Sequence, residues 1–597
     1  MLQPLASVGA ETKEIEKVCC GGGCCLSQDV STDPRLPTTS PVIPPDNEAY
    51  RSLGIGLGSL GADTPLSQIT DLPEQTVSFH WLPKSPSPPY MSDNSKRGDH
   101  PPDFVTPHPP YGVFSARLHH ARELTRPGAE KRTYHFDIDV TDYPKESGDV
   151  DFIVGGAIGI QAPNSPAIVD EVFNHLCIPT YLRDKPITLD TNKGRWPTIW
   201  GDDRPRSLVT TRRELLTWCS DLQSYPPTKQ LFRLLAEHSS AANERQILFY
   251  LSSAQGQAAF CDLRTAQHIT VPHLLTAFPS AQPPMSHLLT VLQPLMPRFY
   301  SLSQDPQLSC VGASDKEGST VRRRLVEIAV TVHDSPHYRD GLRTGVGSGF
   351  LERTARQIID AEQAGIDPAS LDLRIPMFRG LMANPLAREF VTDGPMLLIG
   401  AGVGIAPFRG FVQRRLKSAN CANKVWVLQG VRDSLLDELY SGEWGVEEDQ
   451  VKKVVESRRG EGRYVQEEVR HQADLVWYVI NSLDGRVFVC GSGKGMGEGV
   501  ERALVDVVMD KGGVRKEEAE AFWEGKRAAG QYIAASLAPV CPVGIMTNGS
   551  TGNMVNQRRM AGVFDFTYFA NSIWQGLLLH WNGANTGRRR QELTLPM

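Results

Sequence analysis

An alternation of apolar and polar residues begins shortly after residue 110. In "TYHFDIDV", residues 133–140, apolar side chains at every second position indicate a strand with one buried face. "YGVFSARLHHARELT" precedes this stretch across the turn-like "RPGAEKR", so the pattern predicts an antiparallel pair of strands. A glycine-interrupted apolar stretch, "FIVGGAIGIQAPN", predicts a further strand.

From about residue 166 the apolar period becomes helical. In "TTRRELLTWCSDL", Thr211 and Glu214 have the spacing of a capping box ahead of Leu215. Helices are predicted to about residue 285, after which "PRFYSLS" and "LVEIAVTVH" have the pattern of strands. Because strands lie on both sides of it, we predict that the helical block is an insertion in a β-rich domain rather than a separate unit.

Past residue 372 strands and helices alternate, which favours a parallel α/β domain. In "GPMLLIGAGVGIAPFRGF" an apolar strand leads into Gly400, Gly402 and Gly404, and a helix opens at Pro407. Glycines let the main chain approach a ligand closely, and the amides at a helix start attract phosphate. This spacing is not that of the dinucleotide fingerprint, so a tight strand-to-helix turn without a ligand stays open as the alternative.

Two further motifs follow in the same domain. "SRRGEGRYVQ" gathers arginines, a serine and a tyrosine, which suit a phosphate and an adenine ring, although a solvated charged loop is the alternative. "GRVFVCGSGKGMGEGV" repeats the order of strand, glycine turn and helix, with Cys490 at the end of the strand. Its "GSGK" is not a P-loop, because Gly495 stands where a Ser or Thr is required.

The composition adds limits on size, partner and compartment. At 597 residues and 40% hydrophobic content, the chain is long enough for three or four domains. Lys and Arg total 62 against 68 for Asp and Glu, a net charge of -6, so we predict no nucleic-acid partner. No apolar run is long enough for a transmembrane segment. Most of the 11 cysteines are scattered singly, as in a reducing compartment, so we predict a cytoplasmic protein.

Residues 1–105 are rich in Pro, Ser and Gly and show little apolar periodicity, so we predict a disordered tail. Within it, "CCGGGCC" places four cysteines close together: Cys19, Cys20, Cys24 and Cys25. The spacing fits no standard zinc pattern. Three interpretations stay open, namely reactive thiols on a flexible arm, a lipid tether and a soft-metal site.

Five segments stand in an order and at separations that resemble the FAD- and NADPH-binding portion of the diflavin reductases: "RFYSLS", "GVGSGFL", "GAGVGIAPFRGF", "SRRGEGRYVQ" and "VCGSGKGM". This family includes NADPH-cytochrome reductase, the sulfite reductase flavoprotein and methionine synthase reductase. The resemblance covers about residues 108 to 535. "GGAIGIQAPN" is similar to the sulfite reductase flavoprotein, although Gly156 stands where that family usually has Asp.

The resemblance implies a multidomain fold that combines α+β and α/β parts. We expect an antiparallel β-barrel that binds FAD and carries a helical insertion, followed by a Rossmann-like parallel α/β domain of the ferredoxin reductase type that binds NADPH. The expected boundaries are 1–105 for the tail, 106–371 for the FAD domain with its insertion at about 166–285, 372–534 for the NADPH domain, and 535–597 for a poorly ordered C-terminal extension.

The resemblance also implies roles for single residues. Arg298 is expected to pair with the FAD pyrophosphate, Tyr300 to lie on the flavin ring, and Ser301 to bond near the flavin N5 atom. The resemblance implies that a second contact to the FAD pyrophosphate comes from Gly345, Val346 and Ser348.

For NADPH, the resemblance implies that Gly402 and Gly404 hold the pyrophosphate and that Cys490 lies beside the nicotinamide. The resemblance further implies that four residues hold the 2'-phosphate end of NADPH, namely Ser457, Arg458, Arg463 and Tyr464. The implied reaction is hydride transfer from NADPH to FAD, with Ser301 and Cys490 as the catalytic residues.

Departures from the family shape the remaining expectations. Where the family has an FMN-binding domain we expect only the disordered tail, and we therefore expect electrons to pass to a separate protein that contains FMN, haem or an iron-sulfur cluster. Val403 replaces a family threonine, and "AGQYIA" runs into an extension in place of the usual acidic and aromatic ending. We expect this extension to be a translation artefact and to weaken discrimination against NADH. The alternative function is a catalytically weakened binding or regulatory protein that keeps the fold.

Overall fold

The computed structural model describes most of the chain between residues 40 and 536. The described ranges are 40–82, 99–107, 112–144, 152–192, 196–197, 204–266, 269–308, 310–314, 320–339, 341–380, 386, 394–416, 424–445, 448–460 and 462–536. The cysteine cluster near residue 20 and nearly all of the C-terminal extension lie outside these residues, so the expectations for both stay predictions. No helix of the described part is long and apolar enough to cross a membrane.

The described residues fall into two compact units. The first consists of the described residues within 1–109, 163–296 and 334–346, and the second consists of the described residues within 110–162, 297–333 and 347–597. The helical block is therefore inserted in the sequence, as predicted. The prediction that it is not a separate unit is wrong, because its buried side chains form a core of their own with residues from the N-terminal segment.

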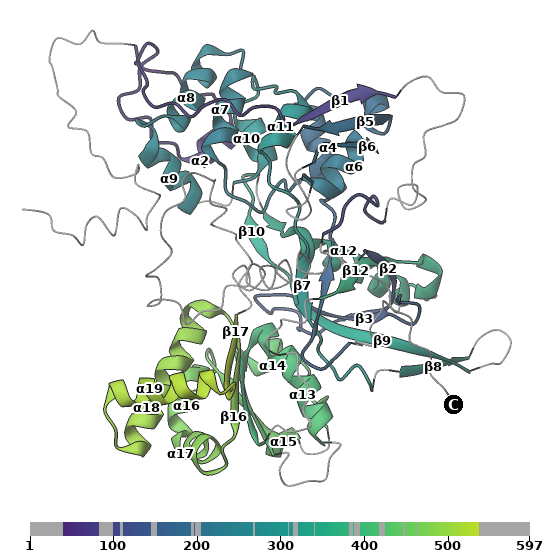
Figure 1. Cartoon of the computed structure of the whole chain (residues 1–597), viewed down its shortest axis with the longest axis vertical. Helices are drawn as coiled ribbons and strands as arrows, with labels where there is room; N and C mark the ends of the chain where they lie inside the picture. The colour runs from purple at the N-terminus through teal and green to yellow at the C-terminus, as the bar shows by residue number, and fades with distance from the viewer. Residues whose placement is uncertain are drawn as a thin grey trace, which may run out of the picture. The chain divides into compact units, whose positions relative to one another are not determined.

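Helices dominate the first unit (Figure 1). They are α2 (Glu48–Leu53), α4 (Pro166–His175), α5 (Thr180–Arg183), α6 (Arg212–Glu214), α7 (Lys229–Glu237), α8 (Ala242–Ser252), α9 (Gln257–Ala266), α10 (Val271–Ala277) and α11 (Met285–Val291), with a π-helical turn at Leu215–Cys219. The predicted capping box is confirmed: the Glu214 amide donates to the Thr211 hydroxyl, and the Thr211 amide donates to the Glu214 carboxylate.

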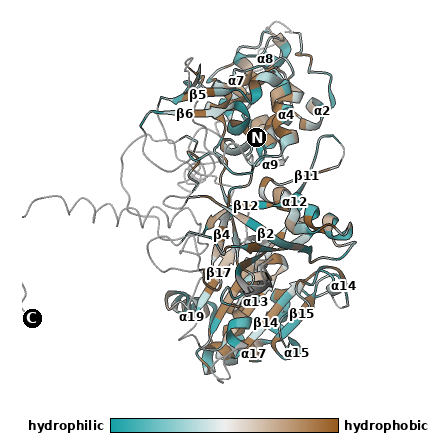
Figure 2. Ribbon diagram, turned by 90° about the vertical axis from the view of Figure 1, so that its right-hand side faces the viewer, coloured by the Kyte–Doolittle hydropathy of each residue, from teal (hydrophilic) through white to brown (hydrophobic). Residues whose placement is uncertain are grey.

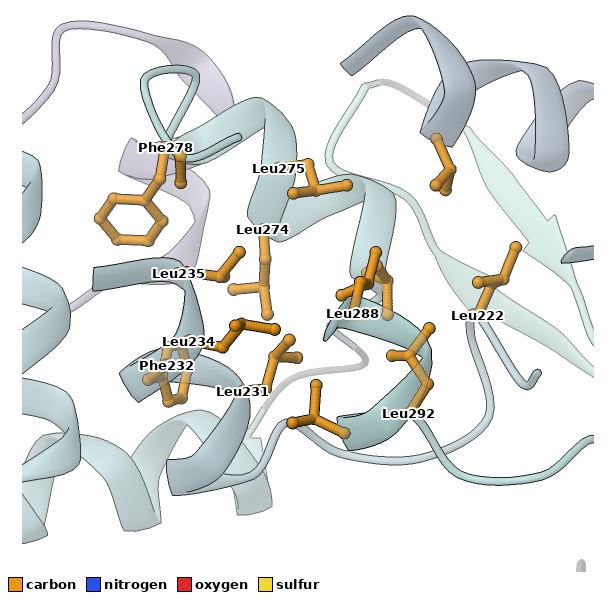
Figure 3. Packing of buried hydrophobic residues seen from close by; sticks show 14 of the residues in the cluster. Leu222, Leu231, Phe232, Leu234, Leu235, Leu274, Leu275, Phe278, Leu288 and Leu292 are labelled. Carbon is orange, nitrogen blue, oxygen red and sulfur yellow. The ribbon is translucent and has the colours of Figure 1, made fainter. Parts of the chain in front are cut away.

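A leucine-rich core holds these helices together. Figure 3 shows side chains of α7, α10 and α11 pointing toward one another, among them Leu234, Leu274 and Leu288, each at most 1% exposed. Burying such a side chain contributes about 2 kcal/mol. Figure 2 shows hydrophobic and hydrophilic residues interspersed along the helices, as expected where one face of each helix lies in the core.

Part of the predicted tail belongs to this core. Residues 40–82 contain α2 and the strand β1 (Val77–Trp81), and Tyr50, Leu53 and Val77 are buried. The prediction of disorder is wrong for this segment. A few apolar side chains, although they show no regular period, are enough to hold it against the core of the first unit. β1 pairs with β5 (Pro186–Thr191), which pairs with β6 (Arg206–Thr211), and a separate hairpin joins β10 (Asp334–Pro336) and β11 (Leu342–Thr344).

The second unit begins with a seven-stranded antiparallel sheet in the order β7-β4-β12-β2-β3-β9-β8. Its strands are β2 (Phe114–Glu123), β3 (Thr133–Asp139), β4 (Ala157–Ile160), β7 (Arg298–Ser301), β8 (Cys310–Ser314), β9 (Thr320–Thr331) and β12 (Arg374–Arg379). The antiparallel pair predicted from alternation is β2 and β3. An isolated bridge between Leu302 and Ile328 also joins the end of β7 to β9. The long helix α12 (Val346–Gln363) and the short 3-10 turn Pro368–Leu371 precede β12.

A five-stranded parallel sheet follows in the order β15-β14-β13-β16-β17. Its strands are β13 (Met396–Ala401), β14 (Val425–Val431), β15 (Lys452–Glu456), β16 (Arg486–Gly491) and β17 (Tyr532–Ser536). β17 therefore runs two residues into the segment predicted as an extension. The parallel α/β arrangement predicted beyond residue 372 is confirmed.

Helices cover both faces of the parallel sheet. Leu398 packs with Phe408 and Phe411 on one face, whereas Leu397 packs with Val469 and Val500 on the other. This alternation explains the unbroken apolar run of β13, because both faces of the strand are buried. The helices of the first face are α13 (Ala406–Leu416), α14 (Ser434–Asp437) and α15 (Glu448–Val451), and those of the second are α16 (Val465–His471), α17 (Ala473–Trp477), α18 (Glu498–Gly512) and α19 (Lys516–Ala528), with short π turns at Tyr478–Ser482 and Gly493–Gly497.

Candidate functional site

The strand order of the parallel sheet reverses between its two inner strands. β13 is first in sequence, β14 and β15 extend the sheet to one side, and β16 and β17 extend it to the other. In open parallel sheets, ligands bind beyond the carboxyl ends of the strands at such a switch point. The glycine turn after β13 and Cys490 near the end of β16 both lie there, since Gly400 is in register with Cys490.

Gly404 lets the turn after β13 approach the end of β16 closely. A Cβ at Gly404 would lie 2.3 Å from the Cys490 carbonyl oxygen and 2.6 Å from its carbon. Gly402 differs: its φ is +54°, in the left-handed region, and an added Cβ would meet none of the described atoms within 4 Å. Gly404 is therefore required by close packing and Gly402 by backbone conformation. The turn Gly402–Ile405 then leads into α13, whose N-terminal end attracts an anion.

Cys490 is fully buried beneath this turn. Burial raises the pKa of its thiol to about 12, because a thiolate would lose its hydration there. The thiol is therefore neutral at physiological pH. It can pack against a ring or donate a weak hydrogen bond, but it does not act as a nucleophile.

The four residues predicted for the 2'-phosphate lie at and after the end of β15, and they differ in their contacts. The Ser457 hydroxyl donates to the Val431 carbonyl at 3.2 Å, and Arg463 pairs with Glu468 at 2.9 Å. Tyr464 is exposed and directly precedes α16. The Arg458 guanidinium is exposed at the same end of the sheet. Of the two arginines, Arg458 is thus the more accessible to an anion.

Sequence reasoning missed two charged residues beside Arg458. Arg432 follows β14, the strand next to β15, and its guanidinium lies 3.2 Å from Glu130. Glu130 comes from the connection between β2 and β3 and pairs with Arg458 at 2.5 Å. No local motif marks either residue, because strand order and the position of a distant turn bring them together. The two arginines offer the paired forks that suit a phosphate group.

The three residues predicted for the flavin lie on β7, which pairs with β4. Tyr300 is opposite Ile158, and Ser301 is opposite Ala157. Strand alternation places Arg298 and Tyr300 on one face and Ser301 on the other. Burial raises the pKa of Tyr300 to about 12, so its hydroxyl stays protonated and can donate a hydrogen bond.

The beginning of α12 lies against Arg298 and Tyr300. A Cβ at Gly347 would lie 2.7 Å from the Tyr300 hydroxyl oxygen and 3.2 Å from the Arg298 Cγ. Gly347 was not predicted, although it stands inside the quoted motif "GVGSGFL". The start of this 18-residue helix supplies main-chain amides and a positive dipole end beside the Arg298 side chain, which fits a pyrophosphate.

The predicted Gly345, Val346 and Ser348 also lie at this helix start. Val346 is the first residue of α12 and is buried. The Ser348 hydroxyl accepts a hydrogen bond from the His333 amide at 3.1 Å, so in this structure it stabilises the chain after β9. The structure therefore gives Ser348 a local contact beside its implied role, whereas Gly347 lies against Tyr300 and Arg298 of β7.

α13 is attached to the segment that directly follows β7. Arg414 makes a bidentate ion pair with the fully buried Asp305 at 2.6 and 2.7 Å, and the Gln413 amide oxygen accepts from the Asp305 amide at 3.0 Å. A Cβ at Gly410 would lie 2.7 Å from the Gln304 carbonyl carbon. These contacts attach α13, the helix that follows the glycine turn, to the segment directly after the strand that carries Tyr300.

His135, Asp137 and Glu327 have the donor types of a metal centre, with ligand atoms within 4.8 Å of one another. Their existing partners account for the cluster without an ion. His135 bonds to Asp137 at 2.8 Å and to the Tyr440 hydroxyl at 2.9 Å, and the Arg409 guanidinium lies 2.7 Å from Glu327. Although burial alone would raise the pKa of Asp137, its hydrogen bonds and ion pairs with His120 and His135 hold that pKa below its usual range. Arg409 already provides the positive charge that Glu327 requires.

Two family models match the chain. The model described as FAD binding domain matches residues 107–350, and the model described as oxidoreductase NAD-binding domain matches residues 398–502. An uncharacterized FAD-binding protein of Schizosaccharomyces pombe is 44% identical over 80% of this chain and 86% of its own length.

Reductases with assigned names are more distant. The methionine synthase reductase of Caenorhabditis elegans is 29% identical over 54% of this chain and 46% of its own length. The sulfite reductase flavoprotein alpha-component of Mannheimia succiniciproducens is 26% identical over 70% of this chain and 60% of its own length. The chain thus spans about half of these longer proteins.

Proposed function

Because the chain belongs to the diflavin reductase family, of which it represents the FAD- and NADPH-binding portion, we propose that it transfers hydride from NADPH to FAD and then passes electrons to a separate acceptor protein. FAD and NADPH are its cofactors. The observation that carries the proposal is the switch point of the parallel sheet, where Gly404 and Cys490 lie together. The helix that begins there, α13, is attached through the Arg414–Asp305 ion pair to the segment that follows β7.

The residues of the chain would act by binding and orientation. FAD supplies the ring that accepts the hydride, and the protein sets the distance and angle of approach. Arg298 and the start of α12 would hold the FAD pyrophosphate, and Tyr300 would lie on the ring. The Ser301 hydroxyl would bond near the N5 atom. Neutral Cys490 would pack against the nicotinamide.

The proposal extends to the shape of the antiparallel sheet, the electron acceptor and the compartment. The seven-stranded sheet would close into a barrel, which the Leu302–Ile328 bridge between β7 and β9 supports. The acceptor would be a protein that contains FMN, haem or an iron-sulfur cluster, and a partner like that of the sulfite reductase flavoprotein is one candidate. We place the reaction in the cytoplasm, because the cysteines are mostly scattered singly.

An anaerobic visible titration tests the proposed function. The purified protein should be yellow, and NADPH should bleach the flavin absorbance at lower concentration than NADH. A colourless protein that fails to take up added FAD would contradict the proposal and favour a scaffold that has lost its activity.

Replacing Arg458 with Ala is expected to raise the KM for NADPH about ten-fold, because a charge-assisted hydrogen bond to phosphate is worth about 1.5–3 kcal/mol. The KM for NADH should change little, since NADH has no 2'-phosphate. Arg459→Ala is the control, because Arg459 is the neighbouring arginine and pairs with Asp433 at 3.2 Å. Equal increases for both nucleotides would remove Arg458 from the 2'-phosphate site.

Replacing Cys490 with Ala is expected to slow flavin reduction by NADPH about ten-fold with FAD still bound, because a small misplacement of reacting rings is costly. With the thiol pKa raised to about 12, the group stays protonated below that pH, so the wild-type rate should show no thiol titration between about pH 7 and 9. Stopped-flow absorbance measures both effects. In the native protein, iodoacetamide should modify exposed Cys177 and spare Cys490; rapid labelling of Cys490 would contradict its burial.

A further inference from the structure

The carboxylate of Glu130 lies between two guanidinium groups at the end of the parallel sheet. Its Oε2 is 2.5 Å from Arg458 Nη1, and its Oε1 is 3.2 Å from Arg432 Nη2. The side chains are 48% exposed for Glu130, 61% for Arg458 and 31% for Arg432. An anion in solution can therefore reach this group of three residues, which we call the Glu130 bridge.

Main-chain hydrogen bonds hold both sides of the Glu130 bridge in place. The Arg458 amide donates to the Arg432 carbonyl at 2.9 Å, which keeps the two arginines side by side. On the other side, the Arg126 amide donates to the Leu436 carbonyl at 2.8 Å, which fixes the turn containing Glu130 beside α14. The pKa of the Glu130 carboxyl is lowered, chiefly by its hydrogen bond to Arg458, so the group is ionised at neutral pH. Main-chain hydrogen bonds as well as ion pairs therefore hold the three residues of the Glu130 bridge in place.

We propose that Glu130 is a specificity-determining residue that occupies the 2'-phosphate position and competes with NADPH for Arg432 and Arg458. The inference rests on the proposed function. A carboxylate carries one charge and two acceptor oxygens, whereas a phosphate monoester carries nearly two charges and three oxygens. The phosphate therefore displaces the carboxylate, but only after the existing bonds to Glu130 are broken.

Glu130 also has the chemistry that suits NADH. A carboxylate at this end of a nucleotide-binding sheet accepts a hydrogen bond from the ribose 2'-hydroxyl of a nucleotide without the extra phosphate. NADH can bind with the Glu130 bridge intact, whereas NADPH must open it. Glu130 thus reduces the ratio by which the protein binds NADPH more tightly than NADH, a ratio that Arg432 and Arg458 raise.

The test compares Glu130→Gln with the wild-type protein. Gln keeps the size of the side chain and removes its charge. The KM for NADPH should fall about two- to five-fold, the range expected for an exposed ion pair, and the KM for NADH should stay equal or rise. Asp506→Asn is the matched control, because Asp506 is an exposed carboxylate that pairs with Arg470 at 2.7 Å elsewhere in the same unit. It should leave both values unchanged.

A binding measurement separates this inference from the proposed function. Calorimetry with adenosine 2',5'-bisphosphate needs no flavin reduction, and Glu130→Gln should bind this compound more tightly than the wild-type protein does. Weaker binding would show that Glu130 orients the arginines instead, and equal binding would show that it does not compete; either result overturns the inference. Failure of NADPH to bleach the wild-type flavin would instead contradict the proposed function.

Discussion

Gly404→Ala is expected to raise the KM for NADPH at least ten-fold while the protein keeps its FAD. The added Cβ would lie 2.3 Å from the Cys490 carbonyl oxygen, a main-chain atom inside a parallel sheet that has no room to move. The turn would therefore shift away from β16, and overpacking of this kind typically costs about 1–3 kcal/mol. FAD should stay bound, because its implied residues lie on β7 and α12. Flavin absorbance measures occupancy, and stopped-flow reduction measures NADPH binding.

Gly402→Ala is the matched control two residues away. Its added Cβ would meet none of the described atoms within 4 Å, so the cost is the left-handed backbone alone, about 1–2 kcal/mol. We expect a smaller loss of NADPH affinity than for Gly404→Ala. Equal losses in the two variants, or an unchanged KM in Gly404→Ala, would show that close packing against Cys490 does not shape the site.

Asp305→Asn is expected to lower the free energy of unfolding by about 3 kcal/mol, because it leaves the Arg414 guanidinium without its carboxylate partner. The Asp305 side chain is 0% exposed, and both of its oxygens bond to Arg414 at 2.6 and 2.7 Å. Urea denaturation followed by tryptophan fluorescence measures the change. Since this pair attaches α13 to the segment after β7, flavin reduction by NADPH should slow as well.

A double-mutant cycle completes this test. Once Asp305 is Asn, Arg414→Gln should cost much less than it does in the wild-type protein, because the pair is already broken. The exposed pair of Asp506 and Arg470 provides the comparison, and Asp506→Asn should change the free energy of unfolding by less than about 1 kcal/mol. Additive effects of Asp305→Asn and Arg414→Gln would show that the two side chains do not depend on each other.

Much of the site was predictable because its signals are local. The glycine turn after β13 and Arg458 after β15 lie within short motifs whose residues stay together in any fold. Glu130 and Arg432 carried no such signal. They meet Arg458 because β14 lies beside β15 and because a turn of the antiparallel sheet reaches the same end.

The burial of single residues was also not predictable from the sequence pattern. Alternation predicts His135 as a polar, outward position of β3, yet it is buried, because Tyr440 and Glu327 cover it. Residues 40–82 show no regular apolar period, yet Tyr50 and Val77 fill the core of the first unit. The composition of a segment does not show which of its single side chains are buried against residues far away in the sequence.

The sequence by itself determined the antiparallel pair β2 and β3, the alternation of strands and helices beyond residue 372, the positions of the glycine turns and the membership of the family, because periodicity, turn geometry and motifs depend on residues close together in the chain. The tertiary structure alone decided which turn Cys490 lies beneath, which acid pairs with Arg458 and which helix is attached to the segment after β7. Those contacts join residues far apart in sequence. They depend on strand order and packing, for which a single sequence carries no local signal.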